Sequence, residues 1–227
     1  MSKILSNLTV IKAVISEAAK KSGRLAEDIK LIGVTKTIEP QRIRELLAAS
    51  VYYLGESRVQ EFLPKYEELQ QPQPTWHFIG HLQRNKVKFV VGKVAMIHSV
   101  DNMPLAQEID KRAKGAGIVM DCLVEINIAG EDSKHGLDPN LALSFVKELE
   151  ELKNICVKGL MCIAPFVDNA EDNRIYFKKM HSLLIDINAH RTHNNSLTEL
   201  SMGMSGDYAI AIEEGATMVR IGTALVG

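Results

Sequence analysis

Leu31-Ile32-Gly33-Val34 is a short apolar run, and a helical pattern follows closely behind it. The helix is expected to begin at Pro40, because a proline in the first turn has no N–H to leave unpaired. Ile43, Leu46 and Leu47 then recur at the spacing that places side chains on one face of a helix. A strand followed by a helix is the repeating unit of a parallel sheet.

The same unit recurs along the whole chain. Further apolar runs of strand length lie at 51–54, 76–79, 94–97, 122–126, 159–163, 196–200 and 218–221. Helical patterns lie near 58–70, 84–92, 104–115, 139–151, 171–189 and 207–214. Eight such runs without a long spacer or a Pro/Gly/Ser-rich linker predict an α/β fold that closes into a parallel eight-stranded (β/α)8 TIM barrel, with residues 1–227 as one domain. An open, doubly wound sheet is the alternative.

The composition is that of a globular protein with a core of ordinary size. Of the 227 residues, 46% are apolar and 24% are charged, and neither value resembles a disordered or membrane-spanning chain. Lys and Arg number 27 against 28 Asp and Glu, so no positive excess marks a nucleic-acid partner. We expect a monomer that binds neither nucleic acid nor a membrane.

The first twenty residues predict an extra N-terminal helix rather than an export signal. Lys12 and Glu17 interrupt the apolar character, and no cleavage pattern follows. Apolar residues alternate at steps of four and three, which is typical of an amphipathic helix, and we expect this helix to cap a barrel end. These residues are Ile4, Leu8, Ile11, Ile15 and Ala18.

The three cysteines predict a reduced, cytoplasmic setting. Cys122, Cys156 and Cys162 are odd in number, lack CxxC spacing and stand among apolar residues. We expect them to be core residues rather than nucleophiles, because none has an activating base nearby in the sequence.

Lys36 is the first candidate functional residue. Active sites of such barrels lie where the strands end, and Lys36 comes two residues after Val34. Partial burial at the barrel mouth would lower the pKa of its amine toward the neutral, nucleophilic form, which forms an imine with an aldehyde. A solvated loop lysine is the alternative interpretation.

The far end of the chain predicts a phosphate site. The segment Ser201-Met202-Gly203-Met204-Ser205-Gly206-Asp207 follows the seventh run and opens a helix, so glycines, hydroxyls and unpaired N–H groups come together. Arg220-Ile221-Gly222-Thr223 adds a second glycine turn after the eighth run. Loops after strands seven and eight are the usual phosphate site of these barrels. For Met202 and Met204, contact with a cofactor is one interpretation, and packing in the core is the alternative.

Barrel closure brings Arg220 beside Lys36, and together the predicted groups fit pyridoxal 5′-phosphate. Lys36 would form a Schiff base with the aldehyde, and the two glycine turns would bind the phosphate. Arg220 would donate a hydrogen bond to the pyridine nitrogen. A permanent cation cannot accept the proton of that nitrogen, so the ring would stay neutral and draw electrons weakly. A barrel-lining ion pair is the alternative for Arg220.

Several motifs resemble those of the YggS/PROSC-type pyridoxal phosphate homeostasis proteins over almost the whole chain. They are Val34-Thr35-Lys36, the block 55–61 (GESRVQE), the block 76–86 (WHFIGHLQRNK), His98-Ser99-Val100-Asp101, Gly159-Leu160-Met161, 200–205 and 219–222. The resemblance implies a barrel like the N-terminal domain of alanine racemase, the cofactor on Lys36, a role in cofactor homeostasis with no established turnover, and, as possible partners, apoenzymes that need the cofactor. Ser57 departs from the asparagine usual in this family, so a cofactor contact made by that amide is in doubt.

An amino-acid racemase is the alternative function. It needs a second acid, for which Tyr52, Tyr53 and Tyr208 are candidates near predicted strand ends. No metal site is expected: His77 and His81 are four residues apart, but no third ligand of suitable spacing follows. The charged segment 131–136 is expected to be a solvated loop, with a lid or a partner surface as alternatives.

Overall fold

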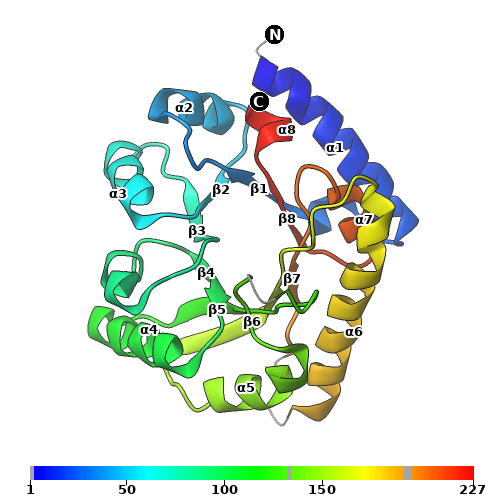
Figure 1. Ribbon diagram of the computed structural model, residues 1–227. Coiled ribbons are helices and arrows are strands. Elements are labelled where there is room, and N and C mark those ends of the chain that lie inside the picture. Colours follow the sequence, from blue (N-terminus) through cyan, green and yellow to red (C-terminus); the bar gives the residue numbers. More distant parts are fainter. Residues whose placement is uncertain (1–2, 132–133, 192–195) are drawn as a thin grey trace.

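The computed structural model describes residues 3–131, 134–191 and 196–227. Its strands form a closed, all-parallel barrel in the order β1 to β8 (Figure 1). The strands are β1 Lys30–Val34, β2 Tyr53–Glu56, β3 Thr75–Phe78, β4 Met96–Val100, β5 Met120–Glu125, β6 Ile155–Met161, β7 Glu199–Ser201 and β8 Met218–Ile221. The predicted (β/α)8 barrel is therefore confirmed, and the open sheet is excluded.

Helices surround the barrel as the sequence predicts. The α-helices are α1 Lys3–Lys21, α2 Pro40–Ala48, α3 Val59–Glu68, α4 Met103–Ala116, α5 Ala142–Leu149, α6 Arg174–His190, α7 Tyr208–Glu213 and α8 Thr223–Val226. Short 3-10 segments are η1 Ala26–Asp28, η2 Arg84–Phe89, η3 Pro139–Leu141 and η4 Ala170–Asn173. The pattern near 84–92 forms the short 3-10 segment η2 and not an α-helix, although Val87, Val90 and Val91 are buried as the pattern predicts.

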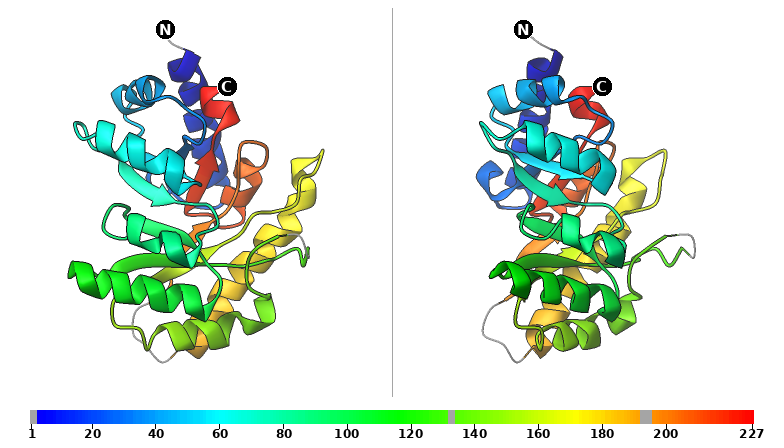
Figure 2. Two further views of the ribbon diagram at one scale, coloured as in Figure 1. Left: turned by 60° about the vertical axis from the view of Figure 1, so that its left-hand side comes forward. Right: turned by 90° about the vertical axis from the view of Figure 1, so that its left-hand side faces the viewer.

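The N-terminal helix α1 forms as predicted, but its expected position was wrong. It lies along the outside of the barrel against α7 and α8, and does not cap an end (Figure 1, Figure 2). Its buried face includes Ile4, Leu8, Ile11 and Ile15, and the helix packs on α7 and α8. In the described part of the chain, no helix combines the length and the apolar character needed to cross a bilayer.

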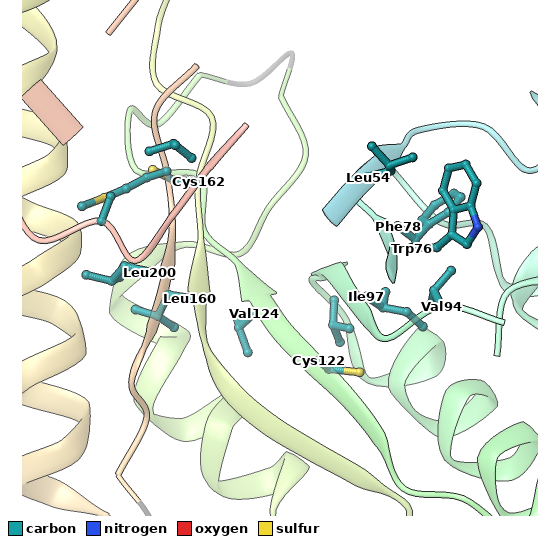
Figure 3. Packing of buried hydrophobic residues seen from close by; sticks show 14 of the residues in the cluster. Leu54, Trp76, Phe78, Val94, Ile97, Cys122, Val124, Leu160, Cys162 and Leu200 are labelled. Atoms are coloured by element: carbon teal, nitrogen blue, oxygen red, sulfur yellow. The ribbon is translucent and has the colours of Figure 1, made fainter. Parts of the chain in front are cut away.

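The core has two parts. The larger part lies between the strands and the helices, where Trp76, Phe78, Ile97 and Cys122 point outward from neighbouring strands (Figure 3). The smaller part fills the barrel and draws one side chain from each of five strands: Ile32, Met96, Leu123, Met161 and Met218. Successive side chains of a strand point to opposite faces, so residues two positions beyond these also face the barrel interior, nearer the C-terminal ends.

Candidate functional site at the barrel mouth

Lys36 lies at the C-terminal mouth of the barrel, two residues beyond Val34 at the end of β1. Pairing of β1 with β8 closes the barrel and places Ile32 opposite Arg220. A Cβ added at Gly222 would lie 3.4 Å from the Cβ of Val34, so the chain after β8 runs directly beside the end of β1. The predicted neighbourhood of the loops after β1 and β8 is confirmed.

The Lys36 side chain is exposed. It is more exposed than the partial burial predicted from the sequence, because Lys36 lies two residues past the end of β1. What the structure fixes is the backbone on both sides of Lys36.

Thr35, on one side of Lys36, is tied to a buried ion pair. Its hydroxyl donates to Oε1 of Glu56 at 2.6 Å, and its carbonyl oxygen accepts from Nζ of Lys65 at 2.7 Å. The same Nζ lies 2.8 Å from Glu56 Oε1, and the two charged side chains are 9% and 0% exposed. Such a pair is stabilising only while both partners are present, because each charge alone would be buried without compensation.

Thr37, on the other side of Lys36, has a left-handed backbone with φ of 64°. This conformation costs a residue with a Cβ about 1–2 kcal/mol. The Thr37 N–H donates to Oε2 of Glu61 at 2.9 Å, and this bond holds the pKa of Glu61 below its ordinary value. Glu61 and Lys65 are one helical turn apart on α3, so one helix face holds both neighbours of Lys36. We call Thr35, Thr37, Glu56, Glu61 and Lys65 the Lys36 clamp.

The loops after β7 and β8 are joined by a single hydroxyl. Oγ of Ser205 accepts from the backbone N–H groups of Gly222 and Ala224, each at 3.3 Å. Asp207 braces the same β7 loop, because its Oδ1 accepts from the Met204 N–H at 2.7 Å. Hydroxyl and backbone N–H groups thus converge between the two loops, and they are donors of the kind that bind oxyanions.

A polar layer lies inside the barrel between its apolar filling and the mouth. Arg220 belongs to it, two residues after Met218, and is only 4% exposed. Its guanidinium donates to Oγ of Ser201 at 2.7 Å and to the carbonyl oxygen of Cys162 at 2.8 Å. Its backbone N–H donates to the carbonyl oxygen of Gly203 at 3.0 Å. Arg220 therefore links β8 to the ends of β6 and β7.

Two buried histidines continue this layer across the barrel. Nδ1 of His98 lies 3.0 Å from Oγ of Ser201, and Nε2 of His98 lies 2.8 Å from Nδ1 of His77. Burial lowers the pKa of His77 to about 4 and that of His98 well below its ordinary value. Both imidazoles are therefore neutral at pH 7, and a continuous row of polar contacts runs from Arg220 to His77.

Glu125 is the acidic member of the layer. It ends β5, is 6% exposed, and its Oε2 has no hydrogen-bond partner among the described residues. Burial, with the nearby negative charge of Asp101, raises the pKa of Glu125 to about 7, while the positive charge of Arg220 lowers it. This carboxyl group therefore gains and loses its proton near neutral pH.

Comparisons with known proteins agree with this geometry. Residues 7–227 match the family model of the alanine racemase N-terminal domain. A pyridoxal phosphate homeostasis protein of Aquifex aeolicus is 48% identical over 213 residues, which cover 94% of this chain and 92% of that protein. The chain belongs to the pyridoxal phosphate homeostasis protein family. The family resemblance in the sequence motifs is thereby confirmed.

Solved structures of this family have the same barrel. PipY of Synechococcus elongatus is known without and with pyridoxal phosphate bound, and it matches with TM-scores of 0.88 and 0.87 at 33% identity, over 99% of this chain and 100% of that chain. Alanine racemase of Clostridium difficile matches with a TM-score of 0.66 at 21% identity, over 94% of this chain and 55% of that chain. The latter likeness is one of fold alone.

In this member of the family, the residues predicted from sequence fall into two groups. Ser205 and Gly222 come together between the loops, and Thr223 is exposed beside them at the start of α8. Ser201 and Met202 instead point away from those loops: the hydroxyl of Ser201 belongs to the buried layer, and Met202 is 0% exposed in the outer core. The burial of Met202 agrees with its interpretation as a residue that packs in the core.

Sequence reasoning missed the Lys36 clamp and the histidine row. The family block at 55–61 contains Glu56 and Glu61, and Lys65 follows Glu61 by four residues, which is the available signal for a shared helix face. For His77 and His98 no local signal exists, because their contact forms only when β3 and β4 stand side by side.

Ser57 and the cysteines agree with what the sequence indicates. The side chain of Ser57 makes no hydrogen bond within the described residues. Cys122 and Cys162 are buried core residues, and burial raises the pKa of Cys162 to about 12 and raises that of Cys122 as well. Neither thiol is an activated nucleophile.

Proposed function

We propose that this protein binds pyridoxal 5′-phosphate as a Schiff base on Lys36 and holds it in reserve within the cell, with little or no catalysis. The observation that carries this proposal is the position of Lys36: an exposed amine on a backbone fixed from both sides, next to the joined loops after β7 and β8. The names of the relatives and the pyridoxal phosphate bound to PipY support it.

The donor set fits each part of the cofactor. Lys36 offers the amine for the aldehyde, Ser205, Gly222 and Thr223 offer hydroxyl and N–H groups for the phosphate, and Arg220 offers a donor for the pyridine nitrogen. A guanidinium has five N–H donors, so its bonds to Ser201 and Cys162 leave donors free to face the mouth. When bound, the cofactor supplies an aldehyde that forms imines and a ring that withdraws electrons.

A binding role fits the residues of the mouth better than racemisation. Arg220 cannot place a proton on the pyridine nitrogen, so it does not strengthen electron withdrawal by the ring. Racemisation needs a second acid, yet Tyr52 and Tyr53 lie at the N-terminal end of β2, away from the mouth. Only Tyr208, at the start of α7, follows a strand end, and burial raises its pKa above the ordinary value.

The setting of this function is part of the proposal. A single chain contains both the amine and the joined loops, so we propose a monomer that hands the cofactor to apoenzymes. The reduced thiols of Cys122, Cys156 and Cys162 support a cytoplasmic location.

Lys36→Arg tests the covalent link, because arginine keeps the charge but forms no imine under these conditions. The wild-type protein should absorb near about 420 nm with pyridoxal phosphate, and borohydride reduction followed by peptide mapping should label Lys36. Lys36→Arg should lose both signals, whereas Lys86→Ala, which removes another amine after β3, should keep them. A label on a different lysine would overturn the assignment.

Catalysis is tested separately by chiral chromatography of each common L-amino acid with saturating cofactor. We expect slow spectral change, because amino acids compete with Lys36 for the aldehyde, and no sustained racemisation, decarboxylation or transamination. Multiple turnovers that depend on Lys36 would favour the racemase-like enzyme instead.

A further inference from the structure

Three potential metal ligands meet on the opposite side of the mouth from Ser205. They are His81, Asp101 and His135, and one ligand atom of each lies within 4.8 Å of the others. They follow β3, β4 and β5, so three consecutive strand ends contribute one residue each. The sequence offered His77 as a partner for His81, but the fold turns His77 into the barrel and gives His81 these two residues in its place.

We propose that His81, Asp101 and His135 bind a divalent transition-metal ion such as Zn²⁺. Two imidazoles and one carboxylate are ligands of the borderline type that Zn²⁺, Co²⁺ and Ni²⁺ prefer to the oxygen-only sets of Mg²⁺ and Ca²⁺. Three protein ligands leave a fourth position for water or for a small anionic ligand, which is the arrangement of an open zinc site.

The distances permit this with small side-chain rotations. Ligand atoms that bind one Zn²⁺ at about 2.1 Å with tetrahedral angles lie roughly 3.4 Å apart. The present separations of up to 4.8 Å therefore need to shrink by little more than an ångström. The two imidazole rings are stacked, with centroids 3.9 Å apart and planes 12° from parallel, so each ring must turn for both nitrogens to face one ion. Both histidines are exposed, which leaves room for that turn.

The backbone under both histidines is fixed by close contacts. Gly80 precedes His81, and a Cβ there would lie 2.4 Å from the carbonyl oxygen of Ser57. Gly136 follows His135 with a φ of 112°, and a Cβ there would lie 2.6 Å from the backbone nitrogen of Asn127. No side chain fits at either glycine, so the two histidines are presented at set positions although their rings are exposed.

A second observation places another carboxyl group beside Asp101. Val100 pairs with Val124, so Asp101 and Glu125 follow at the same level on neighbouring strands. Glu125 is buried with one carboxylate oxygen unpartnered among the described residues, and burial together with the charge of Asp101 raises its pKa. A divalent cation at Asp101 would offset this repulsion.

Co²⁺ titration of the full-length chain tests the site, because protein-bound Co²⁺ absorbs visible light with an intensity that reports its geometry. We expect saturable binding of one Co²⁺ per chain in the wild type, displaced by Zn²⁺. Lys36→Ala protein should bind equally well, which excludes a metal held by the phosphate of bound cofactor and keeps this outcome separate from that of the cofactor proposal.

Ligand variants locate the ion. His81→Ala, His135→Ala and Asp101→Asn should each weaken Co²⁺ binding at least tenfold, with circular dichroism showing an unchanged fold. His190→Ala is the matched control: it removes another exposed histidine beside an aspartate, Asp186 at 3.3 Å, and should bind Co²⁺ as the wild type does. Absence of saturable binding in the wild type, or unchanged binding in His81→Ala and His135→Ala, would overturn the proposal.

Discussion

The two sides of the barrel mouth are built from different kinds of groups. The loops after β7, β8 and β1, which we call the fixed half, offer hydroxyls, backbone N–H groups, the amine of Lys36 and the guanidinium of Arg220. The loops after β3, β4 and β5, which we call the titratable half, offer His81, Asp101, Glu125 and His135. The fixed half thus supplies the amine and the donors for the cofactor, whereas the titratable half should respond to cations and, through Glu125, whose pKa burial raises to about 7, to protons.

The largest expected effect is the loss of stability when the buried ion pair of the Lys36 clamp is broken. Lys65→Met leaves the carboxylate of Glu56 buried without its partner, and the free energy of unfolding should fall by about 3–5 kcal/mol. Urea unfolding measures this loss. Arg44→Met is the matched control, because it breaks an exposed ion pair with Glu68 and should cost less than about 1 kcal/mol. Equal losses in the two variants would contradict the assignment of a buried pair.

The titratable half should make stability depend on pH. Glu125 keeps its proton in the folded protein up to about pH 7, whereas in the unfolded chain it loses the proton near its ordinary value. Stability from this group is therefore fully present below that ordinary value and is lost as pH rises through 7, by about 3 kcal/mol. Glu125→Gln should remove this alkaline loss in urea unfolding at pH 5 and pH 8. An unchanged difference between the two pH values would contradict the raised pKa.

The buried imidazoles should make stability fall at acidic pH, which we call the acid limb. His77 stays neutral in the folded protein down to about pH 4 but is protonated below its ordinary value when unfolded. Stability is therefore lost as pH falls through that range. The two limbs overlap and oppose each other in mildly acidic solution, so Glu125→Gln should leave the acid limb intact and make it steeper there.

Next in size are substitutions that remove donors from the joined loops. Ser205→Ala and Thr223→Ala should each lose a hydrogen bond to a charged phosphate, about 1.5–3 kcal/mol, or roughly tenfold to a hundredfold in affinity for pyridoxal phosphate. Equilibrium dialysis measures the affinity. Ser205→Ala should also lower the free energy of unfolding slightly, because the N–H groups of Gly222 and Ala224 lose their acceptor. Thr223→Ala should not, because Thr223 is exposed. Unchanged affinity in both variants would place the phosphate elsewhere.

The smallest expected effect concerns backbone strain beside Lys36. Thr37→Gly should raise the free energy of unfolding by up to about 1 kcal/mol, because glycine adopts the left-handed conformation without the Cβ penalty. Ser50→Gly is the matched control, since Ser50 has the same φ of 64° away from the site. Stabilisation in the control alone would show that the bond from Thr37 to Glu61 already compensates the strain.

How far the sequence predicts this molecule depends on how local each signal is. All eight strands are indicated by apolar runs, because strands of a parallel barrel are buried on both faces. Lys36 and the two glycine turns follow from their position after a strand. The histidine row and the three-residue cluster at His81 join residues on or after different strands, so no spacing along the chain reveals them. Of the Lys36 clamp, only Glu61 and Lys65 are linked by their spacing, because both lie on α3.

Other differences have a similar cause. The exposure of Lys36 and the inward direction of Ser201 depend on how far each strand extends, and element ends are the least certain part of any pattern. Part of the charged segment 131–136 lies outside the described residues, namely positions 132 and 133, and within the rest His135 stacks on His81. The expected solvated loop thus contains one residue with a specific neighbour.

All hydrogen bonds in the row from Ser201 to His77 must point the same way along the row. A neutral imidazole has one N–H, so the two rings must carry it on the same nitrogen: if Ser201 donates to His98, both hold it on Nε2, and if His98 donates to Ser201, both hold it on Nδ1. A molecule at the mouth that accepts the Ser201 proton selects the second arrangement. Nitrogen NMR shows which ring nitrogen of His77 carries the proton. That position would report, from the far side of the barrel, whether Ser201 donates to a bound molecule.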